Sequence, residues 1–274
     1  RILYTGFFIT GYFIGDRLVF PEEKNFLDKS RITFMKFQLW QLMLIMMLAA
    51  CNGNNNASTS EEDNLGIKSA TEKREANLAM IAELKSTVED GDLVLRSGTD
   101  FSSEQVKLFS RKDQTYSHGG IAFHDSGDVY IYHIVPDYLR ITNKARKEKL
   151  DSFCNPSQNT ALGLARYNID SAEKMIFRDY LVMQYNRKVP FDPMFDLTND
   201  DSMYCSEMIR NGLILATKGR VTIETHRFTD RNKLKMIKQH VKLSDKEILG
   251  REFVPIDNLY LNPNCRLLKR FIYE

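Results

Sequence analysis

The stretch that decides the fold reads YSHGGIAFHDSGDVYIYHIV and covers residues 116–135. It holds two runs rich in β-branched and aromatic residues, at 119–123 and 129–135, separated by the turn sequence DSGD. Such runs on either side of a short turn that contains glycine predict an antiparallel hairpin. His118 and His133 would then lie near opposite ends of the hairpin strands and almost face each other.

A cysteine follows at the start of a predicted helix. After a loop at 190–202 that is rich in Asp and Pro, the pattern predicts a helix from about Cys205 to Leu215. The positive end of a helix dipole lowers the pKa of a cysteine and favours the thiolate. Each of these residues taken singly is more often structural, but Cys205, His118 and His133 together supply a nucleophile, a base and a group that orients the base. A zinc site built from the same three side chains is conceivable, but their spacing matches no metal motif, so no cofactor is expected.

The remaining elements predict one α+β domain at residues 69–274, with a small antiparallel sheet packed with helices. The basic run Lys144–Lys149 is typical of a solvated helix face and is assigned no function. The other expected elements are a first helix opened by the capping-box pattern Ser69–Glu72, a strand at Leu93–Arg96, a helix from about Ser102 to Phe109 with Gln105 in the capping position, and a helix at Asp170–Asn186.

The segment before this domain has the layout of a secretory signal. Met35 and a lysine precede an almost wholly apolar run, which ends in Leu48-Ala-Ala-Cys51. This ending resembles the lipobox of bacterial lipoproteins, in which the cysteine becomes the lipidated first residue. We therefore predict an upstream extension at 1–34, a signal peptide at 35–50 and a polar tether at 51–68. Lipidated Cys51 would anchor the protein in the membrane of a bacterial cell envelope.

Composition excludes several other classes of protein. The chain has 274 residues, 43% of them hydrophobic and 27% charged, so it can build a substantial core. Residues 1–50 hold six of the 38 basic and four of the 36 acidic residues, which leaves the remainder neutral and argues against a nucleic-acid partner. The four cysteines form neither a CxxC pair nor a dense disulfide framework.

Several motifs, in this order, resemble the YiiX-like branch of the NlpC/P60 superfamily, the circularly permuted papain-like cysteine hydrolases. The resemblance spans about residues 88–262, and the permuted order places the histidine before the cysteine, as it stands here. The motifs are Gly91-Asp-Leu-Val94, Tyr116-Ser-His-Gly-Gly-Ile121, Pro190-Phe-Asp192 with Phe195-Asp196, Tyr204-Cys-Ser-Glu207 and Pro255-Ile-Asp-Asn-Leu259.

The resemblance implies a permuted papain-like fold with Cys205 as the nucleophile and His118 as the base. The third polar residue of the YiiX-like pattern is generally acidic, and His133 stands in its place, as in the related lecithin:retinol acyltransferase-like proteins. The implied activity is cleavage of an amide in a peptidoglycan peptide or in a lipid-like molecule. A lipid acyltransferase or thioesterase is the alternative, and a catalytically silent binding module on the same fold is a third reading.

Overall fold

A computed structural model describes residues 12–14, 17–19, 60–135, 144–199, 201–231, 238 and 244–274. The chain divides into two units, Arg1–Glu62 and Asp63–Glu274. In the first unit, β1 (Tyr12–Ile14) and β2 (Arg17–Val19) form an antiparallel pair. The predicted signal peptide at 35–50 and Cys51 lie outside the described residues. Among the helices that are described, none is long and apolar enough to cross a membrane.

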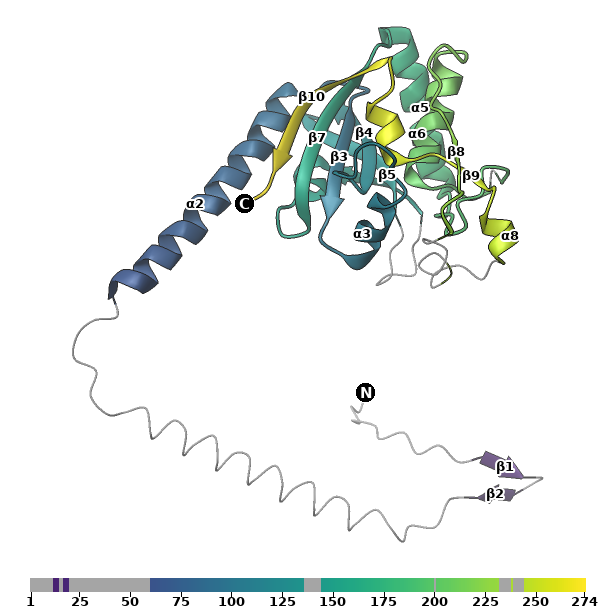
Figure 1. Cartoon of the computed structure of the whole chain (residues 1–274), viewed down its shortest axis with the longest axis horizontal. Coiled ribbons are helices and arrows are strands. Elements are labelled where there is room, and N and C mark those ends of the chain that lie inside the picture. The colour runs from purple at the N-terminus through teal and green to yellow at the C-terminus, as the bar shows by residue number, and fades with distance from the viewer. Residues whose placement is uncertain are drawn as a thin grey trace, which may run out of the picture. The chain divides into compact units, whose positions relative to one another are not determined.

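The second unit is built on a six-stranded antiparallel sheet, which confirms the prediction of an α+β fold. Figure 1 shows this sheet between its helices. Its strand order is β10 (Cys265–Ile272), β7 (Asn159–Tyr167), β3 (Leu93–Gly98), β4 (His118–Asp125), β5 (Asp128–Ile134) and β6 (Ala145–Lys149).

Helices cover both faces of the sheet, so its central strands are buried on both sides. On one face, Leu93 and Leu95 pack in a core with residues of α5 (Ser171–Arg187) and α6 (Cys205–Ala216). On the other face, Val94 packs with residues of α2 (Ser60–Thr87) and α4 (Leu150–Phe153). This alternation follows from the two-residue period of a strand. The remaining elements are α3 (Phe101–Lys107), β8 (His226–Arg227), α8 (Asp245–Ile248), β9 (Glu252–Phe253) and α9 (Ile256–Tyr260).

The predicted hairpin is confirmed, because β4 pairs antiparallel with β5. Ser126 and Gly127 have φ values of 52° and 85° in the turn between the strands. Positive φ at both central residues is the type I′ geometry, which matches the twist of two-residue hairpins.

Three predicted elements differ from the structure. The first helix begins at Ser60 and runs through the predicted cap at Ser69, so residues 60–68, assigned to the tether, are helical. The helix α3 is capped by Asp100, whose carboxylate accepts a hydrogen bond from the backbone N–H of Ser103, and Gln105 lies within the helix. Within the run Lys144–Lys149, residues Ala145–Lys149 form the edge strand β6 and not a helix face, because their backbone pairs with β5.

Candidate active site

Cys205 is the first residue of α6 and is buried, with 7% of its surface exposed. The side chain of Glu207, one turn into the helix, accepts a hydrogen bond from the backbone N–H of Tyr204 at 3.3 Å, which fixes the helix start. Three backbone N–H groups lie near enough to the Cys205 sulfur to act to lower its pKa: that of Gly119 on β4, that of Ser206 and its own. The Gly119 contact joins the helix start directly to the strand that carries His118.

The Cys205 thiol is neutral in this arrangement. Burial raises its pKa to about 11, although the three N–H groups and the charge of Arg96 act in the opposite direction. Burial also raises the pKa values of Cys154 and Cys265, each to about 12. The expectation of a depressed pKa at Cys205 is therefore wrong. The helix start is present, but removal of the sulfur from water outweighs the helix dipole.

His118 and His133 are in direct contact. His118 Nε2 lies 2.9 Å from His133 Nδ1, with the two rings inclined at 71°. Both side chains are buried, at 7% and 1% exposure, and both rings pack against Phe153 of α4. The structure thus brings together two of the three predicted site residues, and Gly119 links this pair to the third, Cys205.

Glu148 extends this arrangement beyond the predicted residues. Its Oε2 lies 3.0 Å from His133 Nε2, although the N–H direction falls outside that of a well-formed hydrogen bond. Burial acts to raise the pKa of Glu148, but the contact with His133 and the charge of Arg96 lower it overall. Glu148 is thus an ionised carboxylate at the far end of a row formed with His133 and His118.

Both imidazoles are neutral at physiological pH. Burial, followed by the charge of Arg96, holds the pKa of His118 well below its usual value. Burial also lowers the pKa of His133, against the opposing effect of Glu148. A carboxylate beside His133 Nε2 favours a proton on that nitrogen, so His133 Nδ1 accepts the hydrogen bond that His118 Nε2–H donates. This tautomer leaves the lone pair of His118 Nδ1 available to accept a proton.

Arg96 is a cation close to His118 and Cys205. It lies opposite His118 in the β3–β4 register, and its guanidinium donates to the Phe153 carbonyl at 3.1 Å and stacks 4.4 Å above the Phe153 ring. Its charge acts to lower the pKa of Cys205, against the larger effect of burial, and it disfavours protonation of His118.

Sequence reasoning missed both Arg96 and Glu148. Glu148 lies within the run to which no function was assigned. The available signal was the spacing of Arg146 and Glu148, which puts both on the same face of β6, where Arg146 is paired with His133. Arg96 could be placed only once the pairing of β3 with β4 was known.

Neither a protein-family model nor a curated protein matches this sequence. A solved structure, metalloprotein yiiX from Escherichia coli, is similar to this chain with a TM-score of 0.54 and 16% sequence identity. The match covers 67% of this chain and 98% of yiiX. The chain has a YiiX-type fold. This finding supports the fold relationship implied by the sequence motifs, and at this identity it extends to the fold alone.

Proposed function

We propose that this YiiX-like protein is an exported, lipid-anchored cysteine hydrolase of the permuted NlpC/P60 type, which cleaves an amide bond through Cys205, His118 and His133. The observation that carries the proposal is the row of contacts from Glu148 through His133 to His118, next to the backbone N–H that lies near the Cys205 sulfur. A nucleophile, a base and an orienting group are the parts that acyl transfer needs.

The first step is proton transfer coupled to attack. Because the thiol and both imidazoles are neutral at rest, the thiolate–imidazolium pair forms only as the reaction proceeds. His118 Nδ1 accepts the thiol proton while the sulfur of Cys205 bonds to the carbonyl carbon. The backbone N–H of Cys205 at the start of α6 then stabilises the negative carbonyl oxygen. His133 holds the tautomer of His118, and Glu148 stabilises the positive charge that the row acquires.

The second half returns the site to its starting state. The carbon–nitrogen bond breaks as His118 gives its proton to the departing amine, which leaves an acyl group on Cys205 as a thioester. Water then attacks the thioester carbonyl and gives a proton to His118. The carbon–sulfur bond breaks, and the proton returns to the thiol. Burial strengthens each electrostatic contact in this sequence, because few water molecules screen the charges.

The similar structure is the metalloprotein yiiX, which raises the question of whether the site residues of this chain fit a metal ion. In the described part of this chain, no three His, Cys, Asp or Glu side chains are grouped as metal ligands. His118 Nε2 and His133 Nδ1 point at each other across 2.9 Å instead of toward a shared position. The site residues thus do not fit a zinc centre, and the mechanism has no metal step.

Two rival functions follow from the same geometry. The pair His118–His133, in place of a histidine and an acid, resembles the arrangement in lecithin:retinol acyltransferase-like proteins, which favours acyl transfer between lipids as the second candidate. A silent binding module would keep the fold without turnover.

The test is a turnover assay with purified mature protein. Muropeptides, N-acyl amides and acyl thioesters are incubated with the parent protein, and the products are quantified by liquid chromatography and mass spectrometry. Cys205→Ala and His118→Ala should abolish turnover. Cys265→Ala and His124→Ala serve as matched controls and should retain it, because Cys265 lies on the edge strand β10 and His124 is an exposed histidine of β4.

The preferred substrate separates the two enzymatic candidates. Cleavage of muropeptides or N-acyl amides supports the hydrolase, and transfer from a lipid to an acceptor supports the acyltransferase. If no substrate in the panel is turned over and the parent matches Cys205→Ala throughout, the enzymatic proposal is contradicted and the binding module remains.

The anchor is tested separately. Growing cells with a fatty-acid analogue should label the parent protein at Cys51, and Cys51→Ser should prevent labelling and release the protein from membranes. An unlabelled parent that still carries residues 1–50 would contradict the anchor.

A further inference from the structure

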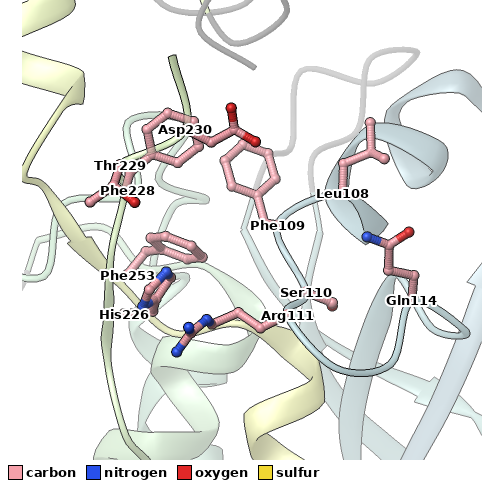
Figure 2. Close-up of a pocket in the computed structure, with 10 residues that line it drawn as sticks. All are labelled: Leu108, Phe109, Ser110, Arg111, Gln114, His226, Phe228, Thr229, Asp230 and Phe253. Atoms are coloured by element: carbon pink, nitrogen blue, oxygen red, sulfur yellow. The ribbon is translucent and has the colours of Figure 1, made fainter. Parts of the chain in front are cut away.

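A small pocket of about 240 Å³ lies where the loop after α3 meets β8 and β9. Figure 2 shows three phenylalanine rings, the basic side chains Arg111 and His226, and the carboxylate of Asp230 among its lining residues. The rings of Phe109 and Phe253 have centroids 5.5 Å apart, and Phe228 lies 5.8 Å from Phe109. The pocket is smaller than the roughly 300–1,000 Å³ of sites for drug-sized ligands, so it suits one end of a larger molecule.

Arg111 supplies a positive charge to the pocket. Its guanidinium lies beside His226 in Figure 2, and within the ranges that the structure describes no acidic side chain forms an ion pair with it. The Arg111 charge disfavours protonation of His226, since burial and then the Arg111 charge lower the pKa of His226, whereas Asp257 acts to raise it. An anionic group bound between the two would pair with the guanidinium and accept a hydrogen bond from the imidazole.

The backbone beneath Arg111 is held in place from inside the protein. Asp257 is fully buried, and its Oδ2 accepts hydrogen bonds from the backbone N–H groups of Arg111, Lys112 and Asp113 at 2.9, 2.7 and 3.3 Å. Arg111 is therefore presented from a fixed backbone, which lowers the entropic cost of binding a ligand.

Ser110 supplies a second, independent observation. It lines the pocket, it is only 4% exposed, and its hydroxyl has no hydrogen-bond partner among the described residues. A buried polar atom without a partner is costly, so such atoms in native proteins usually have a role. Ser110, Arg111 and His226 line one pocket, and each carries a group that can donate a hydrogen bond to an anionic oxygen. The Ser110 hydroxyl has almost no exposed surface, so it would reach the ligand by rotation of its side chain.

The pocket wall is also attached to the residues that flank Cys205. Val254, next to the pocket residue Phe253, donates its N–H to the Tyr204 hydroxyl at 2.9 Å. The carbonyl of Val254 accepts a hydrogen bond from the Ser206 hydroxyl at 2.7 Å. A ligand seated against Phe253 is thus connected to the start of α6 by two short contacts.

We propose that this pocket binds a carboxylate carried on an apolar or aromatic chain, with the carboxylate at Arg111, Ser110 and His226 and the chain against the three phenylalanines. This inference rests on the proposed function and names the substrate class. The substrate would be an acyl compound or amide that carries a carboxylate on an apolar chain at one end. Arg111 and Ser110 are then specificity residues and take no part in bond cleavage.

The experiment compares an acid with its neutral isostere. 3-Phenylpropionate and 3-phenylpropionamide are titrated into the mature protein, and dissociation constants are obtained from NMR chemical-shift changes. The acid should bind ~10-fold more tightly than the amide, as expected for a charge-assisted hydrogen bond. Arg111→Gln should remove this preference, and Ser110→Ala should weaken acid binding by about threefold. Lys112→Gln is the matched control, because Lys112 is exposed, lies next to Arg111 and does not line the pocket.

Equal affinities for acid and amide, or unchanged acid binding in Arg111→Gln, would overturn the proposal. Cys205→Ala separates it from the proposed function, since binding in this pocket does not require the thiol. Acid binding that persists in Cys205→Ala, combined with an inactive parent, would contradict the hydrolase and leave the pocket supported. Full turnover of substrate without any preference for the acid would contradict the proposed carboxylate binding in the pocket and leave the hydrolase supported.

Discussion

Replacing Glu148 by Gln should slow acylation of Cys205 by a factor of about 30 while leaving the fold intact. The carboxylate is separated from His118 by contacts of 3.0 and 2.9 Å and one imidazole ring, so about 8 Å lies between the two charges in the transition state. With an effective dielectric constant of about 20, their attraction is about 2 kcal/mol, which corresponds to about 30-fold in rate. Glutamine keeps the shape and removes this charge.

The assay is stopped-flow measurement of the p-nitrophenol burst from p-nitrophenyl acetate, because the burst reports acylation without knowledge of the natural substrate. Asp151→Asn is the control: it removes a carboxylate from α4, which also carries Phe153, but Asp151 is exposed and pairs with Lys85. The control should stay within about twofold of the parent, as for other surface substitutions. If Glu148→Gln has the burst rate of the control, Glu148 has no part in stabilising the imidazolium.

Three further predictions follow from burial of the site. The pKa values of His118 and His133 are lowered in the folded protein, so the unfolded chain takes up protons first as the pH falls through about 6.5. The free energy of unfolding should therefore be at its full value above that pH and fall below it by up to about 1.4 kcal/mol per pH unit for each histidine. Urea midpoints between pH 7.5 and 5 should show this fall, and an equal fall in the double variant His118→Gln/His133→Gln would contradict it. Gly120→Ala should cost about 1–3 kcal/mol in the same assay, because a Cβ there would press on Ile131 and lie 3.0 Å from His133 Cβ; unchanged stability would refute this steric argument. Alkylation of Cys205 by iodoacetamide should keep rising with pH into the alkaline range, as its raised pKa requires, and a plateau below pH 7 would show that a thiolate exists at rest.

The hairpin and the helix at Cys205 could be predicted from sequence because both depend on local patterns. Runs rich in β-branched and aromatic residues and a turn with glycine specify β4 and β5, and the loop before Cys205 marks the start of α6. The edge strand β6 carries the polar sequence ARKEK, and its conformation depends on pairing with β5, so its pattern did not distinguish a strand from a helix face.

The electrostatics of the site could not be predicted from sequence for a related reason. A helix start can be identified locally, but the desolvation that raises the pKa of Cys205 depends on how the sheet and α6 pack together. Glu148 became a candidate only once β6 was placed beside β5. Glu148 thus brings a carboxylate from the next strand into contact with His133.

The most direct test of a Cys205-centred acyl-transfer site is to map the acyl group by mass spectrometry after rapid acid quenching of the reaction with p-nitrophenyl acetate. We expect a single acetyl thioester on the peptide that contains Cys205, and no adduct in His118→Ala. An acetyl group on Cys154 or Cys265 instead, or equal labelling of Cys205 without His118, would contradict the account.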